Sequence, residues 1–460
     1  MEIINSILKF FQDILGQAAV LIAVIALIGL LIQKKPASDV IKGTVKTFLG
    51  FLVLGAGAGV VVSALDPFGQ MFQQAFKVQG VVPNNEAIVA QALVQYGSNT
   101  ALIMFFGMLV NLLIARVSKF KYVFLTGHHT LYMACLLCVI FTVAGLAPWQ
   151  VVVFGSLGLG ITMVVFPAMA QPFMRRIVKD DSVGFGHFGT VGYVLAGLTG
   201  MVVGKNSKST EDINFPKGLA FLRESSVSIS LTMSLIYVIV AIICGPEYIQ
   251  TNLSDGQNFI VFALMKAVNF AAGVFIILSG VRLLLNEIVP AFKGFSDRLI
   301  PGSKPALDCP VVFPYAPNAV LIGFFSSFVG GIVGMIVLTL TGGPIILPGV
   351  VPHFFCGASA GVFGNSTGGV KGATLGAFLH GVLITFLPVF LMPVLGNLGF
   401  ANTTFSDADF CVTGILFGTA GKLGAIAVIA SVLVLLALIF VLAGFIAKKK
   451  AAKSDADIKA

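Results

Sequence analysis

The sequence predicts an all-α polytopic membrane protein with about eleven transmembrane helices. Of its 460 residues, 57% are hydrophobic and only 10% are charged, and apolar runs of roughly 20 residues recur along the whole chain. The runs are continuous and lack a period of two, which disfavours an outer-membrane β-barrel. The net charge of +9 comes from short Lys and Arg clusters between apolar runs, so it indicates membrane orientation and not nucleic-acid binding.

The apolar runs can be placed one by one. We expect spanning helices at 15–33, 45–65, 97–117, 123–146, 150–174, 226–245, 258–285, 317–341, 347–365, 372–396 and 424–447. Glycines interrupt the segments 183–204 and 410–424, which therefore predict re-entrant hairpins whose unwound backbone lines a cavity. The segments that begin at Pro83 and Pro305 predict half-helices near 83–95 and 305–313.

The basic clusters alternate with loops that carry no positive charge. Loops 147–149, 246–257, 342–346 and 397–409 contain neither Lys nor Arg, whereas the intervening loops contain most of both. By the positive-inside rule, the N-terminus is expected outside the cytoplasm and the basic tail at Lys448–Lys450 inside it.

One motif occurs twice. Gly80-Val-Val-Pro83-Asn-Asn-Glu86 recurs 222 residues later as Gly302-Ser-Lys-Pro305-Ala-Leu-Asp308. Three further landmarks recur in the same order: Gly57 and Pro67 as Gly280 and Pro290, Leu125–Gly127 as Leu347–Gly349, and Phe188–Gly192 as Phe417–Gly421. Each half would contain five spans, and an odd number inverts the second half relative to the first.

The predicted organisation is therefore an inverted five-plus-five repeat with one additional helix. The first repeat covers 1–225, with its half-helix near 83–95 and its hairpin near 183–204. The second repeat covers 226–423, with its half-helix near 305–313 and a hairpin near 410–424. Residues 424–460 form the final transmembrane helix and a basic cytoplasmic tail.

Glu86 and Asp308 are the acids expected at membrane depth. An ionisable group there is costly unless it is paired, hydrated or used in transport. A simpler reading is that each acid caps its own half-helix, and both roles are compatible. Their duplication in the two halves favours a transport site near the midplane.

The histidines divide into two groups. His128 and His187 are candidate ligand contacts, since neutral imidazole offers one donor and one acceptor to a polyol or enediol. We assign structural roles to His129, His353 and His380. The spacing of His, Cys and carboxylate residues predicts no metal site, and the sequence contains no nucleotide-binding or nucleophile motif.

Several motifs together resemble the ascorbate-specific enzyme IIC family of the bacterial phosphotransferase system. They are Val40–Thr47, Leu125–His128, Gly186-His187, Arg298–Gly302, Ala306–Cys309 and Tyr315–Val320. The resemblance implies a homodimeric inner-membrane permease with an inverted repeat, a dimerising scaffold and a mobile core. It also implies transport of L-ascorbate or a related sugar acid, which a separate IIB protein phosphorylates from a phosphocysteine supplied through IIA. No cofactor and no phosphoryl-carrying residue are expected in this chain.

The same resemblance suggests the site residues. His128, His187 and Asp308 fall on ligand-binding positions of the family. Tyr132 and Phe188 stand where some members have glutamine, and Glu86 stands where others have an aromatic hydroxyl. The complete candidate substrate-binding set is His128, His187, Asp308, Glu86, Tyr132, Phe188, Ala87 and Ile88.

Two other classes of function stay open at this point. In a proton- or cation-coupled secondary transporter of a small organic anion or sugar acid, Glu86 and Asp308 would carry the coupling ion. A membrane scaffold without transport would explain the glycine-rich helices but not the duplicated acids.

Overall fold

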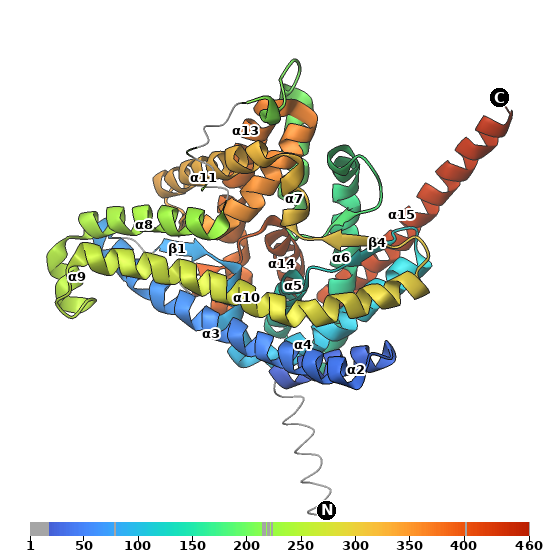
Figure 1. Ribbon diagram of the computed structural model, residues 1–460, viewed down its shortest axis with the longest axis horizontal. Helices are drawn as coiled ribbons and strands as arrows, with labels where there is room; N and C mark the ends of the chain where they lie inside the picture. Colours follow the sequence, from blue (N-terminus) through green and yellow to red (C-terminus); the bar gives the residue numbers. More distant parts are fainter. Residues whose placement is uncertain are drawn as a thin grey trace, which may run out of the picture.

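The computed structural model describes residues 18–77, 80–213, 224–400 and 403–459, together with 218 and 221. Helices make up most of this part of the chain (Figure 1). The first three residues of the span expected at 15–33 lie outside it. All eleven expected spans overlap helices, which supports the predicted all-α membrane class.

Within the described residues, seven helices are long and apolar enough to cross a membrane, or eight if one bent pair is a span. The bent pair is α8 (Ser225–Cys244) and α9 (Pro246–Asn252), which meet at 101°. The seven are α3 (Ala37–Phe76), α4 (Asn85–Val117), α6 (Pro148–Val178), α10 (Phe259–Leu299), α11 (Pro317–Leu340), α13 (Ala358–Leu391) and α15 (Ala425–Lys459). Shorter apolar helices are α2 (Ala18–Ile32), α5 (Gly127–Val143), α7 (Thr190–Val203) and α14 (Ala408–Gly421).

The helix α13 reverses direction at Gly369. This residue has φ +55° and ψ −146°, a conformation that only glycine adopts readily. A straight helix would separate Gly364 and Gly372 by about 12 Å, yet a Cβ on Gly372 would collide with the carbonyl oxygen of Gly364. The continuous helix is therefore a hairpin of two segments, as the two spans expected at 347–365 and 372–396 require.

The helices form two packed groups. The helices α2, α3, α8 and α10 pack against one another, and the helices α7, α11 and α13 form a second group. In Figure 1 the first group occupies the lower and left part of the molecule and the second group the upper part, with α5 and α14 near the centre. Glycine permits close helix contact in the second group, where Cβ atoms at Gly330 and Gly381 would collide with the facing backbone.

Six short strands form two parallel three-stranded sheets, of which the β2-β4-β3 sheet packs against α4 and α6. Their order is β5-β1-β6 in one sheet and β2-β4-β3 in the other. The strands are β1 (Gly80–Pro83), β2 (Tyr122–Phe124), β3 (Gly184–Phe185), β4 (Lys304–Leu307), β5 (Ile345–Ile346) and β6 (Thr403–Thr404). Each copy of the doubled motif thus supplies a central strand, and the opposite half of the chain supplies both its neighbours.

The two segments expected as half-helices differ from each other. A helix does begin within 83–95, at Asn85 directly after strand β1, but it is the start of α4, which continues without a break to Val117. The half-helix expected near 305–313 is strand β4 and two 3₁₀ turns, because Pro310 and Pro314 lack the N–H groups that an α-helix needs.

The segment expected as the second hairpin, 410–424, contains most of α14, which begins at Ala408 after strand β6. Phe188 precedes α7, whereas Phe417 lies in the last turns of α14, so these two residues do not occupy equivalent positions.

Candidate functional site

The carboxyl ends of all six strands meet around one cavity. Because the strands in each sheet are parallel, the residues that follow them gather at one edge of that sheet. The two edges face each other across the cavity. The residues that follow the strands and line it are Asn85 and Glu86 after β1, His128 and His129 after β2, His187 after β3, Asp308 after β4, Val351 and Pro352 after β5, and Ser406 and Asp407 after β6.

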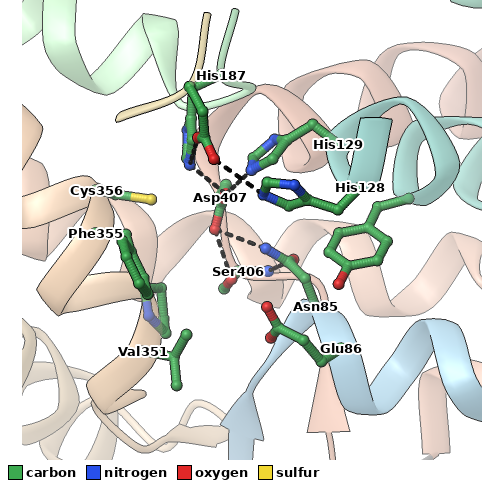
Figure 2. A pocket seen from close by; sticks show the side chains of 13 residues that line it. Asn85, Glu86, His128, His129, His187, Val351, Phe355, Cys356, Ser406 and Asp407 are labelled. Atoms are coloured by element: carbon green, nitrogen blue, oxygen red, sulfur yellow. Dashed lines mark hydrogen bonds and ion pairs between the residues drawn. The ribbon is translucent and has the colours of Figure 1, made fainter. Parts of the chain in front are cut away.

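The cavity is small and strongly polar on one side. Its volume is about 50 Å³, which is enough to hold water. Tyr132, Phe355 and Cys356 complete its walls. Figure 2 shows the imidazoles and carboxylates pointing toward one another, with Val351 and Phe355 on the opposite wall.

Asp407 is held in place by two neighbouring groups. Its Oδ1 accepts hydrogen bonds from Asn85 Nδ2 at 2.8 Å and from Ser406 Oγ at 2.7 Å. Ser406 N–H in turn donates to Asn85 Oδ1 at 2.9 Å. These bonds connect the start of α4 to the start of α14 and leave Oδ2 of Asp407 directed at the histidines (Figure 2).

His129 has a fixed tautomer. Its Nδ1 lies 3.0 Å from the backbone nitrogen of Phe188, which can only donate, so Nδ1 must be unprotonated. The proton of neutral His129 is therefore on Nε2, which lies 3.8 Å from Oδ2 of Asp407. His129 presents a hydrogen-bond donor to the cavity.

His187 and His128 approach the carboxylates from other directions. His187 Nε2 lies 3.9 Å from Asp308 Oδ1 and 4.0 Å from Asp407 Oδ2, while its Nδ1 is 2.7 Å from the hydroxyl of Tyr193. His128 Nε2 lies 3.6 Å from Asp308 Oδ2. Asp308 also accepts a bond from the N–H of Cys309 at 2.7 Å.

Two buried polar atoms at the cavity lack a protein partner among the described residues. They are the hydroxyl of Tyr132 and Nδ1 of His128. Buried polar groups nearly always form a hydrogen bond, to protein or to something bound. Both atoms belong to cavity-lining side chains, so they indicate groups that a ligand or water would satisfy.

The clustered side chains also resemble metal ligands. Three sets have donor atoms within 4.8 Å of one another: His128, His129 and Asp308; His129, His187 and Asp407; and His187, Asp308 and Cys309. Sequence spacing gave no sign of them because each set combines separate strands. A metal-bound histidine carries its proton on the other nitrogen, but Nδ1 of His129 faces an N–H donor and cannot hold one. The two sets that contain His129 are therefore unsuited to a metal.

Five of the eight candidate residues line the cavity: Glu86, His128, Tyr132, His187 and Asp308. Phe188 is buried beside it, stacks on Phe124 at 4.6 Å, and contributes its N–H to His129. Ala87 and Ile88 do not line the cavity, and their N–H groups are bonded to Asn84. Asn84, the helix cap, thus uses the backbone donors that these two residues would offer to a ligand.

Sequence reasoning missed several lining residues. Asn85, Ser406 and Asp407 were not among the candidates, and His129 was assigned a structural role. Asp407 directly precedes an apolar helix, as Asp308 precedes a 3₁₀ turn, and this was the available signal. His353 and His380 lie away from the cavity, where both Nδ1 atoms bond to Ser327 Oγ at 2.8 and 3.0 Å.

Comparison with known proteins adds two findings. Residues 13–409 match the family described as "PTS system sugar-specific permease component", where PTS is the phosphotransferase system. The chain is also 22% identical over 449 residues to the ascorbate-specific PTS system EIIC component of Mycoplasma pneumoniae (strain ATCC 29342 / M129 / Subtype 1). That alignment covers 84% of this chain and 67% of the relative.

Proposed function

Because the chain belongs to the family of sugar-specific permease components of the phosphotransferase system, we propose that it transports L-ascorbate across the bacterial inner membrane. The family and the apolar helices make it a multi-pass protein of that membrane. The ascorbate-specific relative from Mycoplasma pneumoniae supports the choice of substrate.

The observation that carries this proposal is the cavity at the six strand ends. Carboxylates accept hydrogen bonds from sugar hydroxyls, and His129 Nε2–H donates one back. Tyr132 and His128 contribute polar atoms that have no partner among the described residues. Val351 and Phe355 offer an apolar surface to the C–H face of a sugar ring. This combination suits a small polyhydroxylated ligand.

Phosphorylation would be supplied by a partner. In the proposed cycle, ascorbate moves from the periplasm to the cytoplasmic side, where a IIB protein transfers the phosphoryl group that it received through IIA. Five of the six cysteines in this chain are buried and Cys244 is half-buried, so they are poorly placed to act as carriers. The chain would act as the translocator alone.

We further propose an inverted repeat, a periplasmic N-terminus, a cytoplasmic C-terminus and a homodimer. The element order supports the repeat. The series β1, α4, β2, α5, α6, β3 and α7 is matched by β4, α11, β5, the two segments that meet at Gly369, β6 and α14. The exchange of central strands between the two sheets is what a two-fold relation would produce.

Transport in reconstituted vesicles tests the proposal. Labelled ascorbate would be followed with and without IIB and a phosphoryl donor, and we expect ascorbate phosphate to accumulate only with both. Vesicles that contain the His128→Ala variant provide the matched control, with expected loss of uptake. Accumulation of unmodified ascorbate driven by a proton gradient would instead establish a secondary transporter, the function for which the buried carboxylates are also suited.

A further inference from the structure

The cavity has an unusual charge composition for a site that binds an anion. Three carboxylates (Glu86, Asp308 and Asp407) and three imidazoles (His128, His129 and His187) line it. Neither Lys nor Arg is among the described residues that form its walls. Ascorbate is a monoanion at neutral pH because its enediol is acidic. Binding it would add a negative charge to a site that already contains three acids.

Helix N-termini offset this imbalance only in part. The helices α4, α5 and α14 begin at the cavity, and each supplies a partial positive charge there. Glu86 lies in the first turn of α4 and Asp407 directly precedes α14, so the N-terminus of α5 alone has no acidic residue beside it. One partial charge is less than the full charge that the anion adds. Like charges a few ångströms apart repel far more strongly in a buried site than in water.

We propose that the cavity binds the ascorbate anion together with one proton, which is held by His187 between Asp308 and Asp407. This inference rests on the proposed function, since it assumes that ascorbate is the ligand. It differs from proton-driven transport because the proton balances charge in the bound state, and phosphorylation still supplies the driving force.

Among the described imidazoles that line the cavity, only His187 has protein acceptors near both of its nitrogens. Its Nδ1 faces the hydroxyl oxygen of Tyr193 at 2.7 Å, and its Nε2 faces one oxygen each of Asp308 and Asp407. His129 cannot be doubly protonated because the Phe188 N–H occupies its Nδ1. Nδ1 of His128 is buried without an acceptor in the described part of the chain. An imidazolium is therefore best accommodated at His187.

The distances leave room for this change. His187 Nε2 is 3.9 and 4.0 Å from the two carboxylates, beyond hydrogen-bonding distance, so no hydrogen-bonded ion pair exists in the closed cavity. Other titratable groups surround His187, Asp308 and Asp407. From the first half of the chain they are Glu86 on α4, His128, His129 and Tyr132 on α5, and Tyr193 on α7. From the second half they are Cys309 after β4, Cys356 just before α13, His380 on α13, and Asp409 and Cys411 on α14.

Calorimetry on the purified full-length protein tests the inference. Ascorbate is titrated in two buffers of different ionisation enthalpy, and we expect uptake of about one proton per bound ascorbate. Between about pH 6 and about pH 8, the dissociation constant should rise about tenfold per pH unit. Ascorbate binding without proton uptake would overturn the inference and leave the proposed function intact. Absence of ascorbate binding at every pH would overturn the proposed function and the inference with it.

Two variants locate the proton. His187→Gln can still bond to Tyr193 but cannot be charged, so we expect weaker binding with no proton uptake and no pH slope. Asp181→Asn, in a loop away from the cavity, is the matched control and should take up a proton as the wild type does. Uptake of one proton by His187→Gln would overturn the assignment to His187.

Discussion

The two halves of the chain meet at the cavity with the same backbone plan but different side chains. Shifting the first half by the 222 residues of the doubled motif pairs Glu86 with Asp308 and His129 with Val351. All four line the cavity. An acid thus corresponds to an acid, whereas the imidazole of His129 in one half corresponds to the apolar side chain of Val351 in the other. The repeated backbone places the site, and the unequal side chains give it a polar and an apolar wall.

This inequality predicts how a sugar would lie. Hydroxyl groups would face His128, His129 and His187 in the first half, while a C–H face would pack on Val351 and Phe355 in the second. Asp308 and Asp407 would bond at the edges from the second half. A symmetric site could not distinguish the two faces of a ring, so the difference between the halves is where specificity should arise.

The largest loss of stability should come from changes at the two glycines where the chain reverses direction. Gly145 lies between α5 and α6 in the first half, and Gly369 lies within α13 in the second. Gly145 has φ +81° with nothing within 4 Å of a Cβ, whereas a Cβ at Gly369 would collide with the backbone of Lys208. We expect Gly369→Ala to destabilise the protein by about 3 kcal/mol or more and Gly145→Ala by about 1 kcal/mol. Thermal unfolding in detergent measures both. Equal losses would show that the two reversals are under the same constraint.

The next effect concerns the polar and apolar walls. His187→Ala removes a buried donor and leaves the Tyr193 hydroxyl without its partner, so ascorbate affinity should fall by about 2 to 3 kcal/mol, or roughly 30- to 150-fold. Asp308→Asn should have a comparable effect while the protein still inserts into the membrane. Val351→Ala, on the apolar wall, should cost about 1 kcal/mol. Isothermal titration calorimetry with ascorbate compares the three variants. A larger loss of affinity for Val351→Ala than for His187→Ala would mean that the apolar wall contributes more to binding than the polar wall.

The sequence predicted the helical membrane class and the order of the spans because long apolar runs are local signals. It did not predict the six strands. Strand β1 has four residues and pairs only with β5 and β6, more than 250 residues away, so no local pattern reveals it. The total of eleven spans stays a prediction, as do the inverted orientation and the dimer.

Only part of the candidate site was predicted from the sequence, because its residues come from segments that are far apart in the chain. Glu86 and Asp308 were identified because their motif is doubled, but Asp407 belongs to no doubled motif and lies before the expected hairpin boundary. His129 was read as structural, with His353 and His380, because a histidine in an apolar chain is usually a satisfied structural group. At a helix start that projects into a cavity, both neighbours can reach the same space, as His128 and His129 do here.

A smaller effect should follow from the contact between the two hairpins. Asp409 on α14 is fully buried and accepts hydrogen bonds from the N–H groups of Thr190 and Val191, both at 2.8 Å, at the start of α7. Asp409→Ala would leave these donors unpaired, three residues after His187. We expect a loss of about 2 kcal/mol in unfolding free energy and weaker ascorbate binding. Asp409→Asn retains one acceptor oxygen and should keep part of the stability and part of the ascorbate affinity. If the two variants behave identically, the hydrogen bonds from Asp409 to the start of α7 do not account for the loss.

The smallest effect should come from the ion cluster that ties β4 to the end of α6. Asp181 pairs with Lys304 on β4 and with Arg175 at 2.7 Å, and accepts a bond from Gln171. Partial burial acts to raise the pKa of this carboxyl, but the hydrogen bonds from Arg175, Lys304 and Gln171 prevail and hold it well below its ordinary value of 3.8. Because the Asp181 and Arg175 side chains are about half exposed, solvent screens their interaction and Asp181→Asn should cost less than about 1 kcal/mol.

The pH dependence of that variant gives the sharper test. A carboxyl whose pKa is lowered by folding stabilises the folded state fully above the ordinary pKa, and this contribution disappears as the pH falls toward the folded value. The difference in unfolding midpoint between wild type and Asp181→Asn should therefore stay constant from about pH 7 to about pH 5 and narrow below about pH 4. A difference that widens on acidification would mean that the cluster does not stabilise the ionised carboxylate. Ascorbate affinity should be unchanged, since the cluster supports β4 from outside and touches none of the cavity side chains.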